Sequence, residues 1–217
     1  MSCSAWHLYV ILDPSDVGGR DLTEVAAAAI RGGADAVQLR DKTSPDEVVA
    51  EHAHRLLSLT RAVGVPLILN DRVEVAKAVD ADGVHVGQDD WPVARVRKAI
   101  GRTMLIGKST HTIEQALTAQ TEGADYIGFG PLFVTPTKPD ASPIGTSLIG
   151  VVAPRLSIPM VCIGGVDLKT IDEVLRAGAR CVAVVRAVCA AMDPEAATRD
   201  LKTRIVQFHR APVPRGL

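Results

Sequence analysis

Two acidic strings in the middle of the chain each follow a short apolar run. Asp71 follows residues 66–69, and Asp89 and Asp90 follow the next such run, with a helix-like segment at 73–79 between them. Successive strands of a parallel sheet end at the same edge, so Asp71 is expected to meet Asp89 or Asp90 there. Neighbouring carboxylates repel each other unless a cation lies between them, and Mg²⁺ prefers oxygen ligands. We therefore predict a magnesium site and, with it, a phosphorylated substrate.

Asp89 and Asp90 also have a structural interpretation. They precede Trp91-Pro92, and an acidic residue before a proline is typical of a helix start. One of the two could cap a helix while the other binds metal. His85, in the apolar run just before them, is expected to face the interior or the site in a structural role.

A basic string follows the second apolar run of the chain. Alternation along a strand turns Gln38, Arg40 and Lys42 the same way, which would present a guanidinium and an ammonium to phosphate oxygens. The alternative is a surface salt bridge among Arg40, Asp41 and Lys42.

These strings belong to a repeated pattern of strand and helix. Short apolar runs alternate with stretches whose apolar residues recur every three or four positions. The expected strands are residues 8–12, 36–39, 67–69, 84–86, 105–107, 126–129, 160–163 and 182–185. Eight such units predict the α/β class and a single (β/α)₈ TIM barrel over residues 1–217, with 211–217 as a loose tail. An open doubly wound sheet is disfavoured because residues 13–20 lack a glycine-rich dinucleotide loop.

A barrel of this kind builds its active site at the carboxyl ends of the strands, so the remaining tips complete the predicted site. Ser109 offers a hydroxyl after the fifth strand, where Thr112 is a candidate helix cap. A long loop at 130–146 carries Lys138 among prolines. Gly164-Gly165 and a short helix after residue 185 would give backbone amides to a phosphate. With no catalytic triad or activated cysteine in view, the site suits charge stabilisation of a pyrophosphate leaving group.

Composition narrows the possible partners. A net charge of −1 and 3% aromatic residues argue against nucleic acid and against an anionic membrane surface. The chain shows no secretion signal and no run long enough to span a bilayer. Its four cysteines lack metal-ligand spacing and are expected to be reduced thiols of a cytoplasmic protein.

Six strings in register resemble the thiamine-phosphate synthase family over residues 8 to about 191. They are Gln38-Leu-Arg-x-Lys42, Asn70-Asp71, His85-x-Gly-Gln-x-Asp90, Gly107-x-Ser-x-His111, Thr135-Pro-Thr-Lys138 and Gly164-Gly165. Each string alone is weak, but the six together are highly specific.

The resemblance implies a transferase with small-molecule substrates. It would join 4-amino-2-methyl-5-hydroxymethylpyrimidine diphosphate to 4-methyl-5-(2-hydroxyethyl)thiazole phosphate, releasing thiamine phosphate and diphosphate. By the same resemblance, Asp71 and Asp90 bind Mg²⁺ and Gln38 contacts the pyrimidine. The diphosphate would be held by Arg40, Lys42, Asn70, Ser109 and Lys138. The thiazole phosphate would be held by Thr135, Thr137, Gly165, Val185 and Arg186.

Two departures and two alternatives accompany this resemblance. Many family members have serine where Arg186 stands, and residues 140–150 match poorly. A thiazole tautomerase-type paralogue would not need the acidic pair or Arg40 and Lys42. A non-catalytic regulator that binds thiamine phosphates would not need the full diphosphate set. No pattern in the sequence indicates the oligomeric state.

Overall fold

Eight parallel strands close into a ring in chain order, with β1 hydrogen-bonded to both β2 and β8. The computed structural model describes residues 3–137 and 141–210. The strands are β1 (Leu8–Leu12), β2 (Ala36–Leu39), β3 (Leu67–Asn70), β4 (Gly83–Val86), β5 (Leu105–Thr110), β6 (Tyr126–Phe129), β7 (Met160–Ile163) and β8 (Cys181–Val184). The predicted (β/α)₈ barrel is confirmed. Lys138 and the predicted tail at 211–217 lie outside the described residues.

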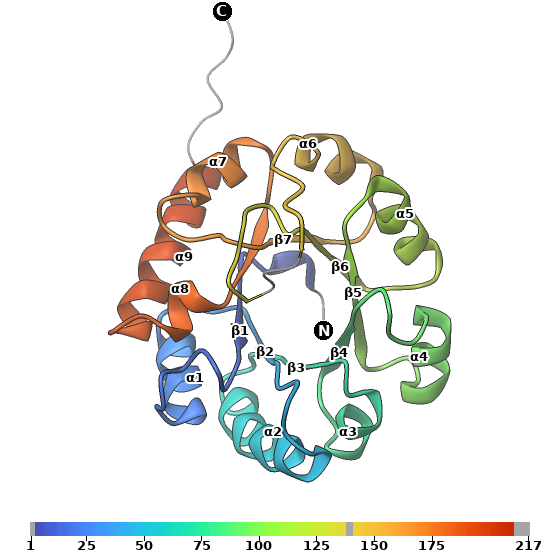
Figure 1. Cartoon of the computed structure of the whole chain (residues 1–217), viewed down its shortest axis with the longest axis vertical. Coiled ribbons are helices and arrows are strands. Elements are labelled where there is room, and N and C mark those ends of the chain that lie inside the picture. The colour runs from blue at the N-terminus through green and yellow to red at the C-terminus, as the bar shows by residue number, and fades with distance from the viewer. Residues whose placement is uncertain (1–2, 138–140, 211–217) are drawn as a thin grey trace, which may run out of the picture.

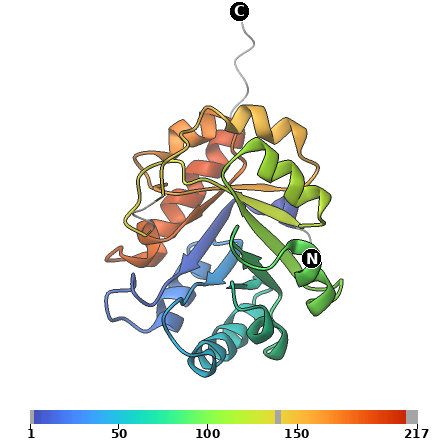
Figure 2. The same cartoon turned by 45° about the vertical axis from the view of Figure 1, so that its right-hand side comes forward.

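Helices surround the strands on the outside (Figures 1 and 2). They are α1 (Leu22–Arg31), α2 (Asp46–Arg61), α3 (Val73–Ala78), α4 (Val93–Ile100), α5 (Ile113–Thr121), α6 (Ile149–Val152), α7 (Ile171–Arg176), α8 (Arg186–Cys189) and α9 (Pro194–Arg210). Short 3₁₀ helices, η1 (Cys3–Ala5) and η2 (Ala153–Arg155), complete the described elements. No helix among the described residues is long and apolar enough to cross a membrane.

The strands are buried on both faces, as parallel strands covered by helices require. One core layer lies between strands and helices, and a second fills the barrel with side chains that include Tyr9, Ile68 and Tyr126. Trp6 packs against both tyrosine rings, and η1 lies across the centre of the ring in Figure 1. Among the described residues, Trp6 therefore helps to fill the barrel interior below the strand tips, and the carboxyl ends of the strands are the end left for a ligand.

Three similar strings, Gly-Ala-Asp at 33–35 and 123–125 and Ala-Asp-Gly at 81–83, have a common structural role. The aspartate before each of β2, β4 and β6 accepts the amide hydrogen at or beside the start of the preceding strand. These pairs are Asp35 with Leu8 at 2.8 Å, Asp82 with Leu67 at 2.9 Å, and Asp125 with Ile106 at 2.7 Å. Charge-assisted bonds of this kind fix neighbouring strands at the end of the barrel away from the site.

The first and last units are joined by a side chain as well as by strand pairing. Arg20, in the β1–α1 loop, donates to the carbonyl oxygens of Ala191, at 2.8 Å, and of Cys189. Helix α9 packs against α1 and α8. The ring is thus closed on its outer surface as well as in its sheet.

Candidate active site

A cavity of about 450 Å³ opens among the loops that follow the strands. Tyr9, Gln38 and His85 lie on strands that line it, and residues 130–137 of the long loop border part of it. The structure brings most of the predicted binding residues to this one cavity. They are Gln38, Arg40, Asn70, Ser109, Thr135, Thr137, Gly165, Val185 and Arg186.

Asp71 and Asp90 come together beside this cavity, as the sequence predicted. Burial raises the pKa of the Asp90 carboxyl above its ordinary value, and a hydrogen bond with Asp71 raises it further. Asp71 itself has a positive φ of 62°, which is uncommon for a residue with a side chain. Its amide donates to the His85 carbonyl oxygen at 2.8 Å. The backbone at the end of β3 is therefore held in the conformation that presents this carboxylate.

The turn after β4 holds Asp90 in place. Asp90 Oδ2 accepts the Gly87 amide hydrogen at 2.6 Å, and the buried Lys108 ammonium donates to the Gly87 carbonyl at 2.6 Å. The predicted helix cap at Asp89 or Asp90 is wrong. Pro92 occupies the N-cap of α4 with no side-chain cap bond, because the Asp90 carboxylate closes the preceding turn instead. The predicted cap at Thr112 is confirmed, since its hydroxyl accepts the Gln115 amide hydrogen.

Asp71 and Asp90 fit a hard divalent cation that is bound by both the protein and the phosphate groups of a substrate. Asp71 and Asp90 supply carboxylate oxygens, which Mg²⁺ prefers. The described residues hold no group of three or more His, Cys, Asp or Glu side chains that would bind a metal by themselves. Magnesium sites with only one or two protein carboxylates take their remaining oxygen ligands from substrate phosphate groups and water.

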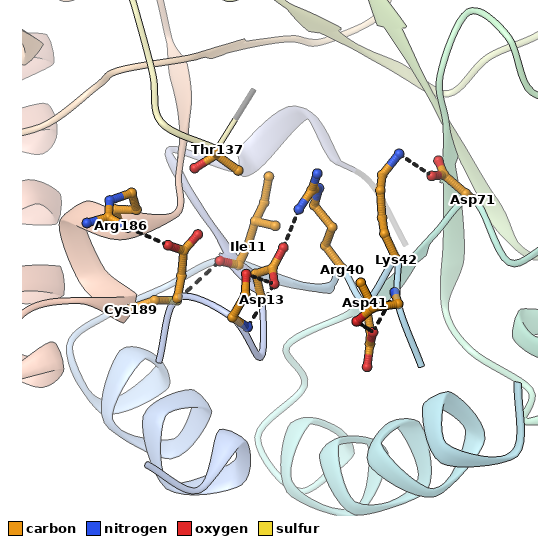
Figure 3. A network of polar contacts seen from close by, with 12 residues as sticks. Ile11, Asp13, Arg40, Asp41, Lys42, Asp71, Thr137, Arg186 and Cys189 are labelled. Atoms are coloured by element: carbon orange, nitrogen blue, oxygen red, sulfur yellow. Dashed lines mark hydrogen bonds and ion pairs between the residues drawn. The ribbon is translucent and has the colours of Figure 1, made fainter. Parts of the chain in front are cut away.

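Arg40 and Lys42 contact acidic groups on neighbouring tips (Figure 3). Arg40 is paired with the buried Asp13, and Lys42 Nζ lies 2.9 Å from Asp71 Oδ2. The alternative salt bridge among Arg40, Asp41 and Lys42 is wrong. Asp41 is buried and accepts the amide hydrogens of the turn that follows it. Arg40 therefore lines the cavity, and Lys42 lies next to the acidic pair.

A chain of hydrogen bonds runs through the floor of the cavity. It links Gln38 Nε2 to Tyr9 OH at 2.8 Å, Tyr9 OH to Tyr126 OH at 3.1 Å, Tyr126 OH to His85 Nδ1 at 3.2 Å, and His85 Nε2 to Ser109 Oγ at 2.9 Å. His85 thus faces the interior, as expected. We call these five residues the hydroxyl relay.

The side of the cavity near β7 and β8 presents backbone amides. Gly164 and Gly165 have φ values of 101° and 67°, and Val185 is the N-cap residue of the short helix α8. A Cβ on Gly164 would lie 2.5 Å from the Pro131 Cα, so glycine lets this turn approach the 130–146 loop. The Arg186 side chain is half exposed and pairs with Asp16 at 2.7 Å. Its guanidinium is therefore engaged by the β1–α1 loop.

Several residues of the site were missed from sequence alone. Tyr9 and Tyr126 read as ordinary strand residues, and Asp13 read as part of an undistinguished loop. Inward alternation along β1 and β6 was the available signal for the tyrosines. Nothing local marks Asp13 as the partner of Arg40, because the two are brought together only by the pairing of β1 with β2.

Comparison with known proteins gives consistent relatives. A family described as thiamine monophosphate synthase matches residues 8–188. Thiamine-phosphate synthase of Roseiflexus castenholzii is 51% identical over 89% of this chain and 86% of its own. That of Chloroflexus aurantiacus is 51% identical over 92% of this chain and 93% of its own.

Solved structures agree. Thiamine phosphate pyrophosphorylase from Pyrococcus furiosus superposes with a TM-score of 0.86 at 36% identity, covering 94% of this chain and 96% of its own. A 3-hexulose-6-phosphate synthase, at 18% identity and a TM-score of 0.63, covers 91% of this chain and 98% of its own and shares the fold alone.

Proposed function

Because this chain belongs to the thiamine monophosphate synthase family, we infer that it is a transferase of thiamine biosynthesis. It joins 4-amino-2-methyl-5-hydroxymethylpyrimidine diphosphate to 4-methyl-5-(2-hydroxyethyl)thiazole phosphate. The products are thiamine phosphate and diphosphate. The bond that forms is between the pyrimidine methylene carbon and the thiazole nitrogen, and the bond that breaks is between that carbon and the diphosphate oxygen.

One observation carries this function: a single cavity has phosphate-binding chemistry at two ends. Arg40, on the β2 tip, and Asn70, on β3, line one side near the acidic pair, whereas Gly165 and the start of α8 line the other. A reaction between a diphosphate and a monophosphate needs two such ends with space between them. The cavity volume of about 450 Å³ lies in the range of small-molecule sites.

Mg²⁺ is the cofactor of the proposal, held by Asp71 and Asp90. When bound, it supplies Lewis-acid stabilisation of the negative charge that develops on the leaving diphosphate. The adjacent Lys42 ammonium, 2.9 Å from Asp71, adds positive charge at the same place. With these positive charges in place, the two carboxylates, which would otherwise repel each other, become part of an anion-binding site.

The other roles follow the family resemblance. Arg40, Lys42, Asn70, Ser109 and Lys138 hold the diphosphate, and Gln38 contacts the pyrimidine. Thr135, Thr137, Gly165, Val185 and Arg186 hold the thiazole phosphate. For Arg186 the backbone amide is the relevant group, because its side chain is already paired with Asp16.

The protein's contribution to the reaction is mainly positioning and charge stabilisation. The aminopyrimidine ring donates electrons as the carbon–oxygen bond breaks, while Arg40 and Lys42 neutralise the departing diphosphate. The glycine turn and α8 hold the thiazole so that its nitrogen traps the pyrimidine cation. No proton transfer to a side chain is needed, so no residue is assigned as general acid or base.

The reaction is proposed to take place in the cytoplasm, which suits four free and buried cysteines. The deciding experiment incubates the purified protein with both substrates and follows thiamine phosphate by chromatography, with MgCl₂ or with excess chelator. We expect product only with the divalent cation. Tight binding of thiamine phosphate without turnover would instead support a regulator, and isomerisation of a thiazole phosphate without magnesium would support a tautomerase.

A further inference from the structure

The hydroxyl relay joins two residues that reach the cavity from different strands. Gln38 lies on β2 and Ser109 on β5, and both line the cavity. Between them stand Tyr9, Tyr126 and His85, of which Tyr126 is fully buried and the others are nearly so. A polar chain in such surroundings is stable only if each donor meets an acceptor.

The direction of this chain follows from its first bond together with the requirement that every buried donor meets an acceptor. An amide nitrogen can only donate, so Gln38 Nε2 gives its hydrogen to the Tyr9 oxygen. In the arrangement that gives every donor an acceptor, the Tyr9 hydrogen is then donated to the Tyr126 oxygen, 3.1 Å away. In the same arrangement the Tyr126 hydrogen is donated to His85 Nδ1, 3.2 Å away.

The direction continues through the imidazole. A neutral histidine whose Nδ1 accepts carries its proton on Nε2. That proton is donated to Ser109 Oγ, which lies 2.9 Å from Nε2. The Ser109 hydroxyl hydrogen is then left to be donated to a ligand in the cavity that Ser109 lines.

The two ends of the relay therefore present opposite chemistry to the cavity. Gln38 Nε2 donates to Tyr9, which leaves Oε1 to accept a hydrogen from a ligand, whereas Ser109 is left to donate one. This polarity matches a substrate with an amino group at Gln38 and an anionic oxygen at Ser109. The reverse polarity would set a serine lone pair against the diphosphate.

We propose that Tyr9, Tyr126 and His85 are positioning residues that fix Gln38 as an acceptor and so select a 4-amino over a 4-oxo pyrimidine. The proposal rests on the proposed function for the identity of the substrate. A 4-oxo group would set its oxygen against Gln38 Oε1. The amide cannot rotate to offer its nitrogen without reversing every bond of the relay.

Two features of the barrel maintain the relay. Burial raises the pKa of Tyr9 and of Tyr126 well above the usual phenol value, so both keep their hydrogens. Gly107 leaves space for the relay, because a Cβ there would overlap His85 Nδ1 and the Tyr126 hydroxyl. The close contact of these two side chains thus depends on a glycine in β5.

The test compares binding of the 4-amino pyrimidine diphosphate and its 4-oxo analogue by calorimetry, with MgCl₂ and without thiazole phosphate. Tyr9→Phe and Tyr126→Phe each remove one hydroxyl and keep the ring. We expect either change to reduce the ratio of the two dissociation constants by about tenfold or more, because the freed amide can rotate to suit the oxo group. The double variant should reduce this ratio no further than either single variant does, since one missing hydroxyl interrupts the whole relay.

Trp6→Phe is the matched control, because Trp6 packs on both tyrosine rings and contributes no hydroxyl to the relay. It should keep the wild-type ratio. An unchanged ratio in either tyrosine variant, or losses that add in the double variant, would overturn the proposal.

A spectroscopic measurement tests the direction itself. In ¹⁵N-histidine spectra, with the signal assigned by loss in His85→Gln, the wild type should show the Nε2-protonated tautomer. The Nδ1-protonated tautomer would overturn the proposal. Turnover is measured separately, so a wild-type protein that makes no thiamine phosphate would refute the proposed function while the binding ratio still tests the relay.

Discussion

At the scale of single residues, the site depends on side chains held by unusual backbone or by buried partners. Asp71 adopts a positive φ, and Asp13 holds Arg40 from inside the protein. Residues in sparsely populated backbone regions cost about 1–3 kcal/mol and persist where the surroundings fix them. The strained residue here carries one of the two carboxylates proposed to bind metal.

Replacing Asp71 with asparagine should lower kcat at least about a hundredfold, because a charged ligand of the proposed metal is lost while the backbone conformation stays available. Steady-state kinetics at saturating substrates measure the effect. Asp80→Asn is the matched control, since Asp80 also has a positive φ, of 55°, but its side chain is 90% exposed and pairs with Arg61. Equal rates for Asp71→Asn and the wild type would refute the metal assignment.

The sequence identified individual site residues where strand ends carry consecutive polar groups. Asp71 and Arg40 were identified in this way, and Asp90 was one of two candidates. It could not decide between Asp89 and Asp90 from the residues alone, because the choice depends on which carboxylate turns back to Gly87. It also missed Tyr9 and Tyr126, whose partners are distant in the chain.

At the scale of elements, helix starts and glycine turns set the shape of the tips. The eight strands were predictable because apolar runs alternate regularly with amphipathic stretches. Their ends were less so: β5 runs to Thr110, three residues beyond the predicted strand, and β8 begins at Cys181. These bounds follow from pairing with neighbouring strands, which local sequence does not encode.

The start of α1 should respond to acid. A hydrogen bond with Arg55 lowers the pKa of the Asp21 carboxyl from its ordinary 3.8 to about 2. A carboxyl whose pKa is lower in the folded state stabilises the fold at pH values above its ordinary pKa. That stabilisation is lost as the pH falls toward the lowered pKa.

Asp21→Asn keeps a good N-cap and removes the charge. The melting temperature should therefore be lower than that of the wild type near neutral pH, and the two should converge as the pH falls from 3.8 toward about 2. Added salt should reduce the difference, because the pair is exposed. Asp200→Asn, an exposed position within α9, is the control. A difference that is independent of pH would contradict the assignment.

The glycine turn after β7 should tolerate no side chain. Gly164→Ala places a methyl group against Pro131 and Leu132, in addition to backbone strain. Gly123→Ala is the matched control, since its φ of 93° is similar to the 101° of Gly164 but nothing lies within 4 Å. Gly164→Ala should cost about 1–3 kcal/mol more in urea unfolding and raise KM for the thiazole phosphate. Equal costs would show that strain alone matters.

At the scale of the whole molecule, the barrel buries its thiols. Cys3, Cys162, Cys181 and Cys189 are free and buried, and burial raises the pKa of Cys162 to about 12. We expect the native protein to react slowly with a thiol reagent such as DTNB and all four thiols to react after unfolding.

Ser58→Cys, at an exposed position on α2, provides the positive control for the reagent. It should add one fast-reacting thiol to the native protein. A fast-reacting thiol in the wild type would mean that one of the four lies nearer the surface than described.

Closure of the ring also has a consequence for synthesis. Strand β1 is synthesised before β8, with which it pairs, and Arg20 is synthesised before its acceptors, the carbonyl oxygens of Cys189 and Ala191. A nascent chain that has not yet delivered Val184 carries β1 with one open edge, the kind of edge that recruits other chains. The ring can therefore close only after β8 has been translated, and termination of synthesis before β8 would release a fragment with an exposed sheet edge.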